Sequence, residues 1–507
     1  MPGWNRSREL PGQLADVFAA LHDWFDDGDY HTEAVNYSWD LDERRDADAT
    51  RLDECLLKSG WATPPEVREY LAAAGTDLPY RAYVVLRCID RWVGRHHPRL
   101  AGGEDDPDAL YDRHGRYNTA ETEGYVLPKW VKGMRGTFLD NQFKHLVRAR
   151  VERDQVLLIG REGGTRHAEP PPNLTFAIVP FLYDLSDATF RGQEQENQHY
   201  FDVFHSEETL RQRVRDAVRA IRAAGVHVAI FPELVLTEAM VEILGEELHA
   251  SELELTSEPP LKWVIAGSYS RAESPKFPLY NSAFVLESGG AVVAFSSPAG
   301  TQHRWVQSKR HRYMLSKGEQ ERYQVVDCFE GDPYDRPEAI SISHRRTFVF
   351  DSKHGRYAIL ICEDWAQEVD TCEVLRKLNC SAIFVIVMDG PVSDRRWSAQ
   401  RVGFFQPHTG ADIAVANSLL LPLRVPPRTL FGGYVLIPQA NGADPLISEW
   451  KYEEEIGDRT NVGLLMLADE PKAHYVNAAT QPSGANASLI SNTRVLGVET
   501  DRADLGS

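Results

Sequence analysis

The sequence predicts an α/β protein in which a layered domain follows a mostly helical N-terminal part, and three observations support this fold class. Apolar residues recur at spacings of three and four up to about residue 150, which is typical of helices that bury one face. From about residue 174, short apolar runs alternate with turns and helical segments. The apolar run 283–294 is interrupted by a tight turn at 287–290, so it predicts a hairpin and requires some antiparallel pairing.

The helical N-terminal domain is expected to span residues 1–170. Its helical spacing is clearest from Leu14 to Leu21 and again from Tyr83 to Trp92. Glycines and prolines gather at 161–173, where they neither continue a helix nor pair well in a sheet, so we expect a linker there. No residue of this domain has catalytic spacing, and its role stays open.

The layered domain is expected over residues 174–470, followed by a polar tail at 471–507. A buried strand at 174–181 opens it. After an irregular polar stretch, a helix capped by Ser206 and ending at Gly225 is expected. The further expected strands lie in order at 226–231, 263–267, 283–294, 356–362, 382–388 and 413–417.

The composition disfavours several classes of partner. The formal net charge of −20 disfavours attraction to nucleic acid or to an anionic membrane surface. No stretch approaches the roughly 18 apolar residues of a membrane span.

The 6 cysteines are scattered without a C-x-x-C pair, which predicts a reduced, cytoplasmic protein. The histidines show no paired metal-ligand spacing, so no metal and no cofactor are expected.

Three reactive side chains stand at or just beyond the ends of apolar segments: Glu233, Lys309 and Cys362. A carboxylate in partly apolar surroundings can act as a general base, a lysine can stabilise an oxyanion, and a thiol activated by a base is a nucleophile. Each residue alone has a structural explanation, as the acid of a helix N-terminus, a surface charge and a small core residue. Their joint occurrence points to covalent acyl transfer.

Further motifs accompany these three residues in the same order. They are Phe231-Pro-Glu233-Leu234, Tyr280-Asn281-Ser282-Ala283, Gly318-Glu319 after Lys309, Ile361-Cys362-Glu363-Asp364, Trp397, Ala416-Asn417 and Phe431-Gly432-Gly433. From about residue 174 to 467 the chain thereby resembles the nitrilase, or carbon–nitrogen hydrolase, superfamily. The resemblance implies an α-β-β-α sandwich that carries a Glu-Lys-Cys triad.

The resemblance also implies a role for each matched residue. Glu233 is then the general base, Cys362 the nucleophile and Lys309 the oxyanion donor, with the backbone N–H of Glu363 as a second donor. Asp364 belongs to the cysteine motif as a supporting residue, and Glu319 is the additional acid near the lysine. The spacing from Lys309 to Gly318 is longer than usual, which leaves Lys317 as an alternative lysine.

The implied reaction is hydrolysis of a small-molecule amide or, less in keeping with the motifs, a nitrile, through a cysteine thioester. The cysteine motif resembles glutaminase domains and amidases more than aliphatic nitrilases. A different function stays open, in which the domain is a binding, regulatory or assembly scaffold for the helical part. The resemblance also implies a homo-oligomer, and residues 1–170 are a candidate surface for a protein partner.

Overall fold

The computed structural model describes a large part of the chain, and every statement below concerns that part. The described residues are 14–28, 30, 37, 47–59, 62–73, 77–96, 117–118, 125–129, 142–151, 156–160, 176–179, 181–182, 185–195, 198–205, 207–253, 260–271, 279–296, 302–329, 334–342, 346–351, 355–367, 371, 373–390, 411–425, 429–437, 446–453, 464–465 and 496–497. The expected linker at 161–173, Trp397 and nearly all of the tail at 471–507 lie outside them. None of the helices in these ranges combines the length and the apolar composition that crossing a membrane requires.

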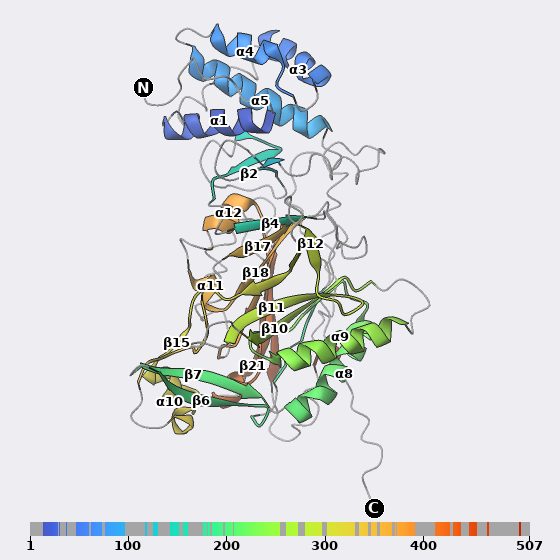
Figure 1. The fold of residues 1–507 in the computed structure, drawn as a ribbon, viewed down its shortest axis with the longest axis vertical. Coiled ribbons are helices and arrows are strands. Elements are labelled where there is room, and N and C mark those ends of the chain that lie inside the picture. Colours follow the sequence, from blue (N-terminus) through green and yellow to red (C-terminus); the bar gives the residue numbers. More distant parts are fainter. Residues whose placement is uncertain are drawn as a thin grey trace, which may run out of the picture.

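Within the described residues, the N-terminal cluster contains the helices α1 (Leu14–Asp27), α3 (Ala47–Ser59), α4 (Pro65–Ala72) and α5 (Leu78–His96). They gather at one end of the molecule (Figure 1) around a core that includes Phe18 and Tyr83. A small sheet follows, made of β1 (Tyr117–Asn118), β2 (Tyr125–Pro128) and β3 (Leu146–Ala149). The N-terminal part therefore contains strands that its helical spacing did not predict.

Asp90 of α5 joins the helical cluster to this small sheet. Its carboxylate accepts backbone hydrogen bonds from Lys144, His145 and Leu146, at 2.9, 2.8 and 2.8 Å. Successive strand residues point to opposite faces. In β2, Val126 accordingly packs into the helical cluster, whereas Tyr125 and Leu127 pack into the core of the layered domain.

Two larger sheets build the layered domain, which confirms the predicted α/β class. One sheet has the order β14-β11-β10-β8-β5, with β9 paired to β10. The pairing of β10 with β8 and of β8 with β5 is parallel, while β11 is antiparallel to both β10 and β14. Its strands are β5 (Phe176–Ile178), β8 (Val228–Ile230), β9 (Leu236–Thr237), β10 (Trp263–Arg271), β11 (Leu279–Glu287) and β14 (Val306–Ser308).

The other sheet has the order β22-β21-β20-β19-β18-β17-β4. Its strands are β4 (Val156–Gly160), β17 (Thr347–Asp351), β18 (Arg356–Ile361), β19 (Ala382–Val387), β20 (Asp412–Asn417), β21 (Thr429–Ile437) and β22 (Leu446–Glu453). Its first strand in the chain, β4, precedes the expected linker and pairs parallel with β17. The sheet therefore draws on residues that we assigned to the N-terminal domain.

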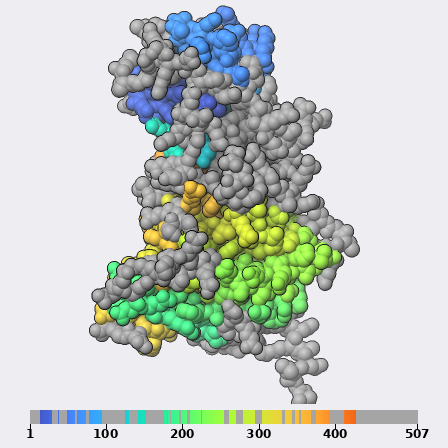
Figure 2. All heavy atoms as spheres, viewed as in Figure 1, coloured from blue at the N-terminus to red at the C-terminus, as the bar shows by residue number. Residues whose placement is uncertain are grey.

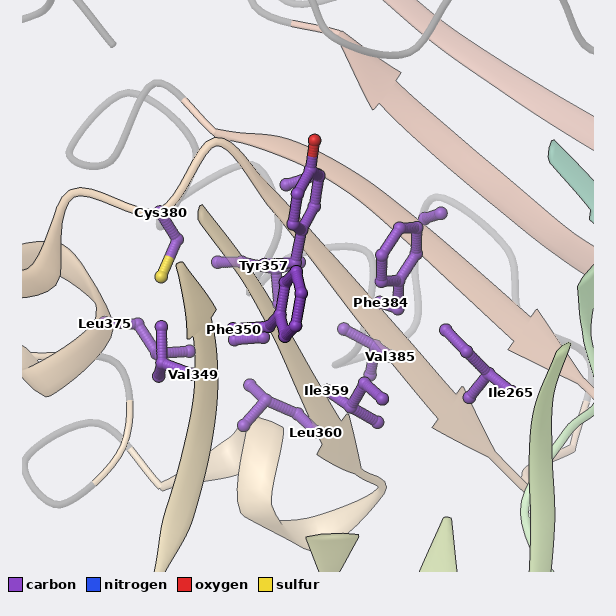
Figure 3. Packing of buried hydrophobic residues seen from close by; sticks show 14 of the residues in the cluster. Ile265, Val349, Phe350, Tyr357, Ile359, Leu360, Leu375, Cys380, Phe384 and Val385 are labelled. Carbon is purple, nitrogen blue, oxygen red and sulfur yellow. The ribbon is translucent and has the colours of Figure 1, made fainter. Parts of the chain in front are cut away.

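The two sheets pack face to face. Trp263 of β10 meets the rings of Phe350 and Tyr357 edge-on, each with centroids 5.2 Å away. Figure 3 shows Ile265 on one side of the β18–β19 layer and Leu375 with Cys380 on the other. Such aromatic packing stabilises the interior beyond area burial alone, typically by about 1 kcal/mol per pair.

Helices cover the outer faces of the two sheets. α8 (Glu207–Ala224) and α9 (Glu238–Leu253) pack on the six-stranded sheet through apolar residues such as Leu210 and Leu244. α11 (Glu363–Ala366) and α12 (Glu373–Leu378) accompany the seven-stranded sheet (Figure 1). The layers are therefore helix, sheet, sheet and helix, as the resemblance implied.

Several short elements lie outside these layers. The 182–205 stretch, expected to be irregular, contains the hairpin of β6 (Ala188–Gln195) and β7 (Gln198–His205). This hairpin lies beside the segment that carries β15, α10 and β16, at one corner of the domain (Figures 1 and 2). The remaining short elements are β12 (Ala294–Ser296), β13 (Gln302–Arg304), β15 (Met314–Leu315), α10 (Lys317–Arg322), η3 (Val326–Cys328), β16 (Arg336–Pro337), η5 (Pro422–Arg424), β23 (Leu464–Leu465) and β24 (Leu496–Gly497).

Candidate active site

Glu233 lies in a sharp turn between β8 and β9. The expected helix after it begins only at Glu238, because Leu234 has a φ of 53° and the chain first forms a short strand. The Glu233 carboxylate is buried, with 2% of the residue exposed. Its Oε2 accepts a hydrogen bond from the backbone N–H of Met388 at 2.9 Å, which links the turn to the end of β19. The acid is thus fixed between the two sheets.

Lys309 directly follows β14, and its backbone N–H donates to the Asn281 carbonyl of β11 at 2.7 Å. Its ammonium lies 2.7 Å from Oε1 of Glu233 and 2.6 Å from Oε2 of Glu338. Burial alone lowers the pKa of Lys309, but these two carboxylates raise it well above its ordinary value. The two carboxylates therefore favour the charged form of the lysine.

Asn281 completes this buried cluster. Its amide nitrogen donates to Oε1 of Glu233 and to Oε1 of Glu338, both at 2.7 Å. Because carboxylate oxygens only accept, the orientation of the amide follows from its partners. Burial raises the pKa of Glu233, the Lys309 ammonium lowers it, and the Glu338 carboxylate raises it, with a net rise. A carboxylate shifted in this direction is a better proton acceptor near neutral pH.

The second carboxylate in contact with the Lys309 ammonium is that of Glu338, which sequence reasoning missed. Glu319 instead closes a capping box with Ser316 at the start of α10 and accepts a hydrogen bond from the Tyr313 hydroxyl at 2.5 Å. Lys317 lies at the first position of α10, and its backbone N–H donates to Asp335. The described contacts therefore place Lys309, and not Lys317, in the acidic cluster.

Cys362 follows β18 directly and is 3% exposed. Its backbone has φ 44° and ψ −105°, a conformation that costs a non-glycine residue on the order of 1–3 kcal/mol. Its N–H donates to the Ile386 carbonyl at 2.9 Å, which holds the residue against β19. Burial raises the pKa of the thiol well above its ordinary value, Glu233 raises it further, and Lys309 opposes this rise. The resting thiol is therefore protonated, and its activation requires a base.

Asp364 connects the cysteine turn to the lysine segment. Its carboxylate accepts backbone hydrogen bonds from Arg310, at 2.9 and 3.1 Å, and from His311 at 2.9 Å. Nδ1 of His311 lies at 2.9 Å from the same carboxylate.

Glu363 lies between Cys362 and Asp364, and its side chain accepts a hydrogen bond from Gln367 at 2.8 Å. Burial raises the pKa of Glu363, while Lys309 lowers it.

Asn417, at the end of β20, supports the neighbouring strand end. Its Oδ1 accepts from the backbone N–H of Asp389 at 2.9 Å, and its Nδ2 donates to the carbonyls of Asp389 and Gly390. Met388, whose N–H holds Glu233, is the preceding residue. The Ala416-Asn417 motif thereby fixes the backbone beside the acid. In the described ranges, no group of three or more His, Cys, Asp or Glu side chains is arranged to hold a metal ion.

No protein-family model matches the chain, and no curated protein matches it in sequence. Its structure is similar to that of a glutamine-dependent NAD+ synthetase from Acinetobacter baumannii, with a TM-score of 0.34, 14% identity, and coverage of 56% of this chain and 44% of the synthetase. The chain thus spans less than half of that enzyme.

Two further similar structures have the same character. The amidase of Nesterenkonia AN1, from the nitrilase superfamily, has a TM-score of 0.33 and 12% identity, with coverage of 56% of this chain and 89% of that one. Nit3 of Saccharomyces cerevisiae, of branch 10 of the nitrilase superfamily, has a TM-score of 0.31 and 11% identity, with coverage of 58% and 94%. The similar structures thus include members of the superfamily that the motifs resemble.

Proposed function

We propose that this protein hydrolyses a non-peptide carbon–nitrogen bond of a small amide through a thioester on Cys362. The observation that carries the proposal is the ammonium of Lys309, which is buried between the Glu233 and Glu338 carboxylates and whose charge lowers the pKa of the Cys362 thiol. A buried cation, a base of raised pKa and a protonated thiol on a strained turn are the parts that general-base nucleophilic catalysis needs.

Acylation begins with transfer of the Cys362 thiol proton to Glu233. The sulfur attacks the amide carbon, the carbonyl π electrons move to oxygen, and the tetrahedral oxyanion is stabilised by Lys309. Among the described residues, the two carboxylates accept two of the three ammonium hydrogens of Lys309. The third hydrogen can therefore be donated to the oxyanion. The backbone N–H of Glu363 is the second donor.

The intermediate then collapses and expels the leaving amine. Glu233 returns its proton to that nitrogen, so that ammonia or an amine departs and the thioester remains. Water then donates a proton to Glu233 and attacks the thioester carbon. A second collapse releases the carboxylic acid, and the proton returns to the Cys362 sulfur. Atoms and charge balance with this chain, its amide substrate and one water molecule.

The test is ammonia release from a panel of amides that includes glutamine, asparagine and acetamide. We expect the wild type to release ammonia from at least one amide and to show an acyl adduct by intact mass after acid quenching. Cys362→Ala should lose both signals. Cys328→Ala is the matched control, because Cys328 is a free, half-buried cysteine outside the acidic cluster.

A protein that releases no ammonia and forms no adduct with any amide or nitrile contradicts the proposal. That result favours the scaffold function. Retention of a cellular phenotype in Cys362→Ala would favour the scaffold more strongly, because binding needs no thiol.

A further inference from the structure

The turn that carries Glu233 is held in an uncommon backbone conformation. Leu234 has a φ of 53°, which a branched side chain rarely adopts unless its surroundings enforce it. On one side the turn lies against Gly267 of β10. A Cβ added there would stand 1.7 Å from the Pro232 carbonyl oxygen. The absence of a side chain at 267 therefore allows the turn to approach the sheet.

His205 holds the other side of the same turn. Its Nε2 lies 2.5 Å from the Leu234 carbonyl oxygen, and its Nδ1 lies 3.1 Å from the Tyr269 hydroxyl. A carbonyl oxygen only accepts, so Nε2 carries the hydrogen, and in the neutral ring Nδ1 then accepts from Tyr269. Burial lowers the pKa of His205 to about 4, which keeps the ring neutral at physiological pH. The tautomer is thus fixed from both ends.

His205 belongs to β7, and the same strand reaches the second carboxylate. Phe201 pairs with Glu338 in a parallel bridge, and the backbone N–H of Ala339 donates to the Phe201 carbonyl at 2.8 Å. The hairpin therefore contacts the backbone next to Glu233, at Leu234, and the backbone of Glu338 itself. These are the two acids that contact the Lys309 ammonium. Figure 1 shows β6 and β7 together at the β15 and α10 corner of the domain.

We propose that the β6–β7 hairpin positions the acids of the active site and that His205, by donating from Nε2 to the Leu234 carbonyl, fixes the turn that aims Glu233. His205 is a positioning residue, since it acts through Leu234. The inference deepens the proposed function and rests on it. Without the hydrogen bond, Leu234 can relax toward negative φ, and the Glu233 carboxylate moves relative to Lys309 and Cys362. Misplacement of a reacting group by about 1 Å can cost about a hundredfold in rate.

The test compares four variants. His205→Leu removes the donor, whereas His205→Gln places an amide N–H near the position of Nε2. Tyr269→Phe removes the hydroxyl that fixes the tautomer. His199→Leu is the matched control, because His199 lies on the same strand but stacks on Tyr334, with centroids 4.7 Å apart.

For a hydrolysed amide, we expect His205→Leu to lower kcat about ten- to a hundredfold with KM within about threefold of the wild type. His205→Gln should recover most of the loss, Tyr269→Phe should show a smaller one, and His199→Leu should match the wild type. Equal kcat in His205→Leu and the wild type overturns the inference. The inference is also overturned if His205→Gln recovers no more of the kcat than His205→Leu, because a purely structural role would not depend on a hydrogen-bond donor at this position.

A second readout does not require amide turnover. The Glu233 carboxylate raises the pKa of the Cys362 thiol, so displacing it should move the pH profile of Cys362 alkylation by iodoacetamide to lower pH. Glu233→Gln gives the full shift, and His205→Leu should shift the profile in the same direction. An unshifted profile in His205→Leu overturns the inference. If no amide is hydrolysed but the profile shifts, the proposed function fails while the positioning role stands.

Discussion

The ammonium of Lys309 lies 2.6 Å from Oε2 of Glu338, a residue 29 positions further along the chain. Glu233 approaches the same ammonium from the opposite direction in sequence, 76 positions earlier. Two carboxylates therefore share one buried cation and one amide, that of Asn281. Breaking a buried ion pair from one side typically costs about 3–5 kcal/mol, because the remaining charges lose their partner.

Glu338→Gln should impair catalysis more than Glu319→Gln. The first substitution removes a charge that holds Lys309, so we expect kcat to fall at least about tenfold. The second keeps the capping box at α10, because a glutamine oxygen can accept the same hydrogen bond from the Ser316 backbone N–H, so we expect stability to change by less than about 1 kcal/mol and kcat to stay within about threefold. Steady-state kinetics and chemical unfolding of both variants give the comparison. The reverse order of kcat losses would show that Glu319 is the acid that serves the lysine.

The sequence predicted much of the fold and of the candidate site because those parts depend on local patterns. Apolar runs located the central strands, and the antiparallel bridge between Leu286 and Val292, across a turn in which Gly290 has a φ of 82°, confirms the predicted hairpin. The strand ends carrying Cys362 and Asn417 were likewise visible. These features depend on residues that are neighbours in the chain, so the pattern of apolar and turn residues predicts them.

The missed features depend on contacts between distant segments. Glu338 follows Arg336-Pro337 in a stretch without a family counterpart, and its only local signal is an acid that precedes an apolar pair. β6 and β7 are rich in polar residues such as Gln193 and Gln198, so periodicity did not separate them from a loop. Their pairing, and the contact of Phe201 with Glu338, arise from tertiary structure.

Asp364→Asn should loosen the lysine segment. The asparagine amide has only one acceptor oxygen for the N–H groups of Arg310 and His311, and its NH₂ group faces a donor in place of the second oxygen. We therefore expect a loss of about 2 kcal/mol in unfolding free energy. We also expect a lower kcat, because Lys309 directly precedes Arg310. His311→Ala is the matched control, since it removes only the side-chain contact. Comparable losses of stability and kcat in the two variants would contradict the role of the backbone contacts.

Gly267→Ala should disrupt the Glu233 turn. The new methyl would overlap the Pro232 carbonyl oxygen, so we expect a loss of about 3 kcal/mol or more in unfolding free energy and a fall in kcat. Gly318→Ala is the control of opposite sign. Its Cβ meets nothing within 4 Å, and α10 should gain about 0.5–1 kcal/mol from the replacement. Thermal unfolding measures both, and a neutral Gly267→Ala would show that the turn does not need the close approach.

The β6–β7 hairpin should carry two opposing pH dependences of stability. Burial lowers the pKa of His205 from 6.5 to about 4, so between these values the unfolded chain binds the extra proton and stability rises with pH. Asp202 behaves oppositely. Burial raises its pKa from 3.8 to about 6, with Glu338 adding to the rise and the Val203 N–H opposing it. The folded carboxyl therefore keeps a proton that the unfolded one has lost, and stability falls as pH rises through this range.

Each pKa difference corresponds to about 3 kcal/mol, so the two contributions nearly cancel between about pH 4 and 6. Single variants should separate them. The unfolding free energy of the wild type minus that of His205→Gln should rise with pH across this window, whereas the wild type minus Asp202→Asn should fall. Denaturant unfolding at half-unit pH steps measures both differences. If the difference in unfolding free energy between the wild type and His205→Gln did not change with pH, the His205 ring would keep its ordinary pKa. The ring would then not be enclosed beside Leu234, as its hydrogen bonds to Leu234 and Tyr269 require.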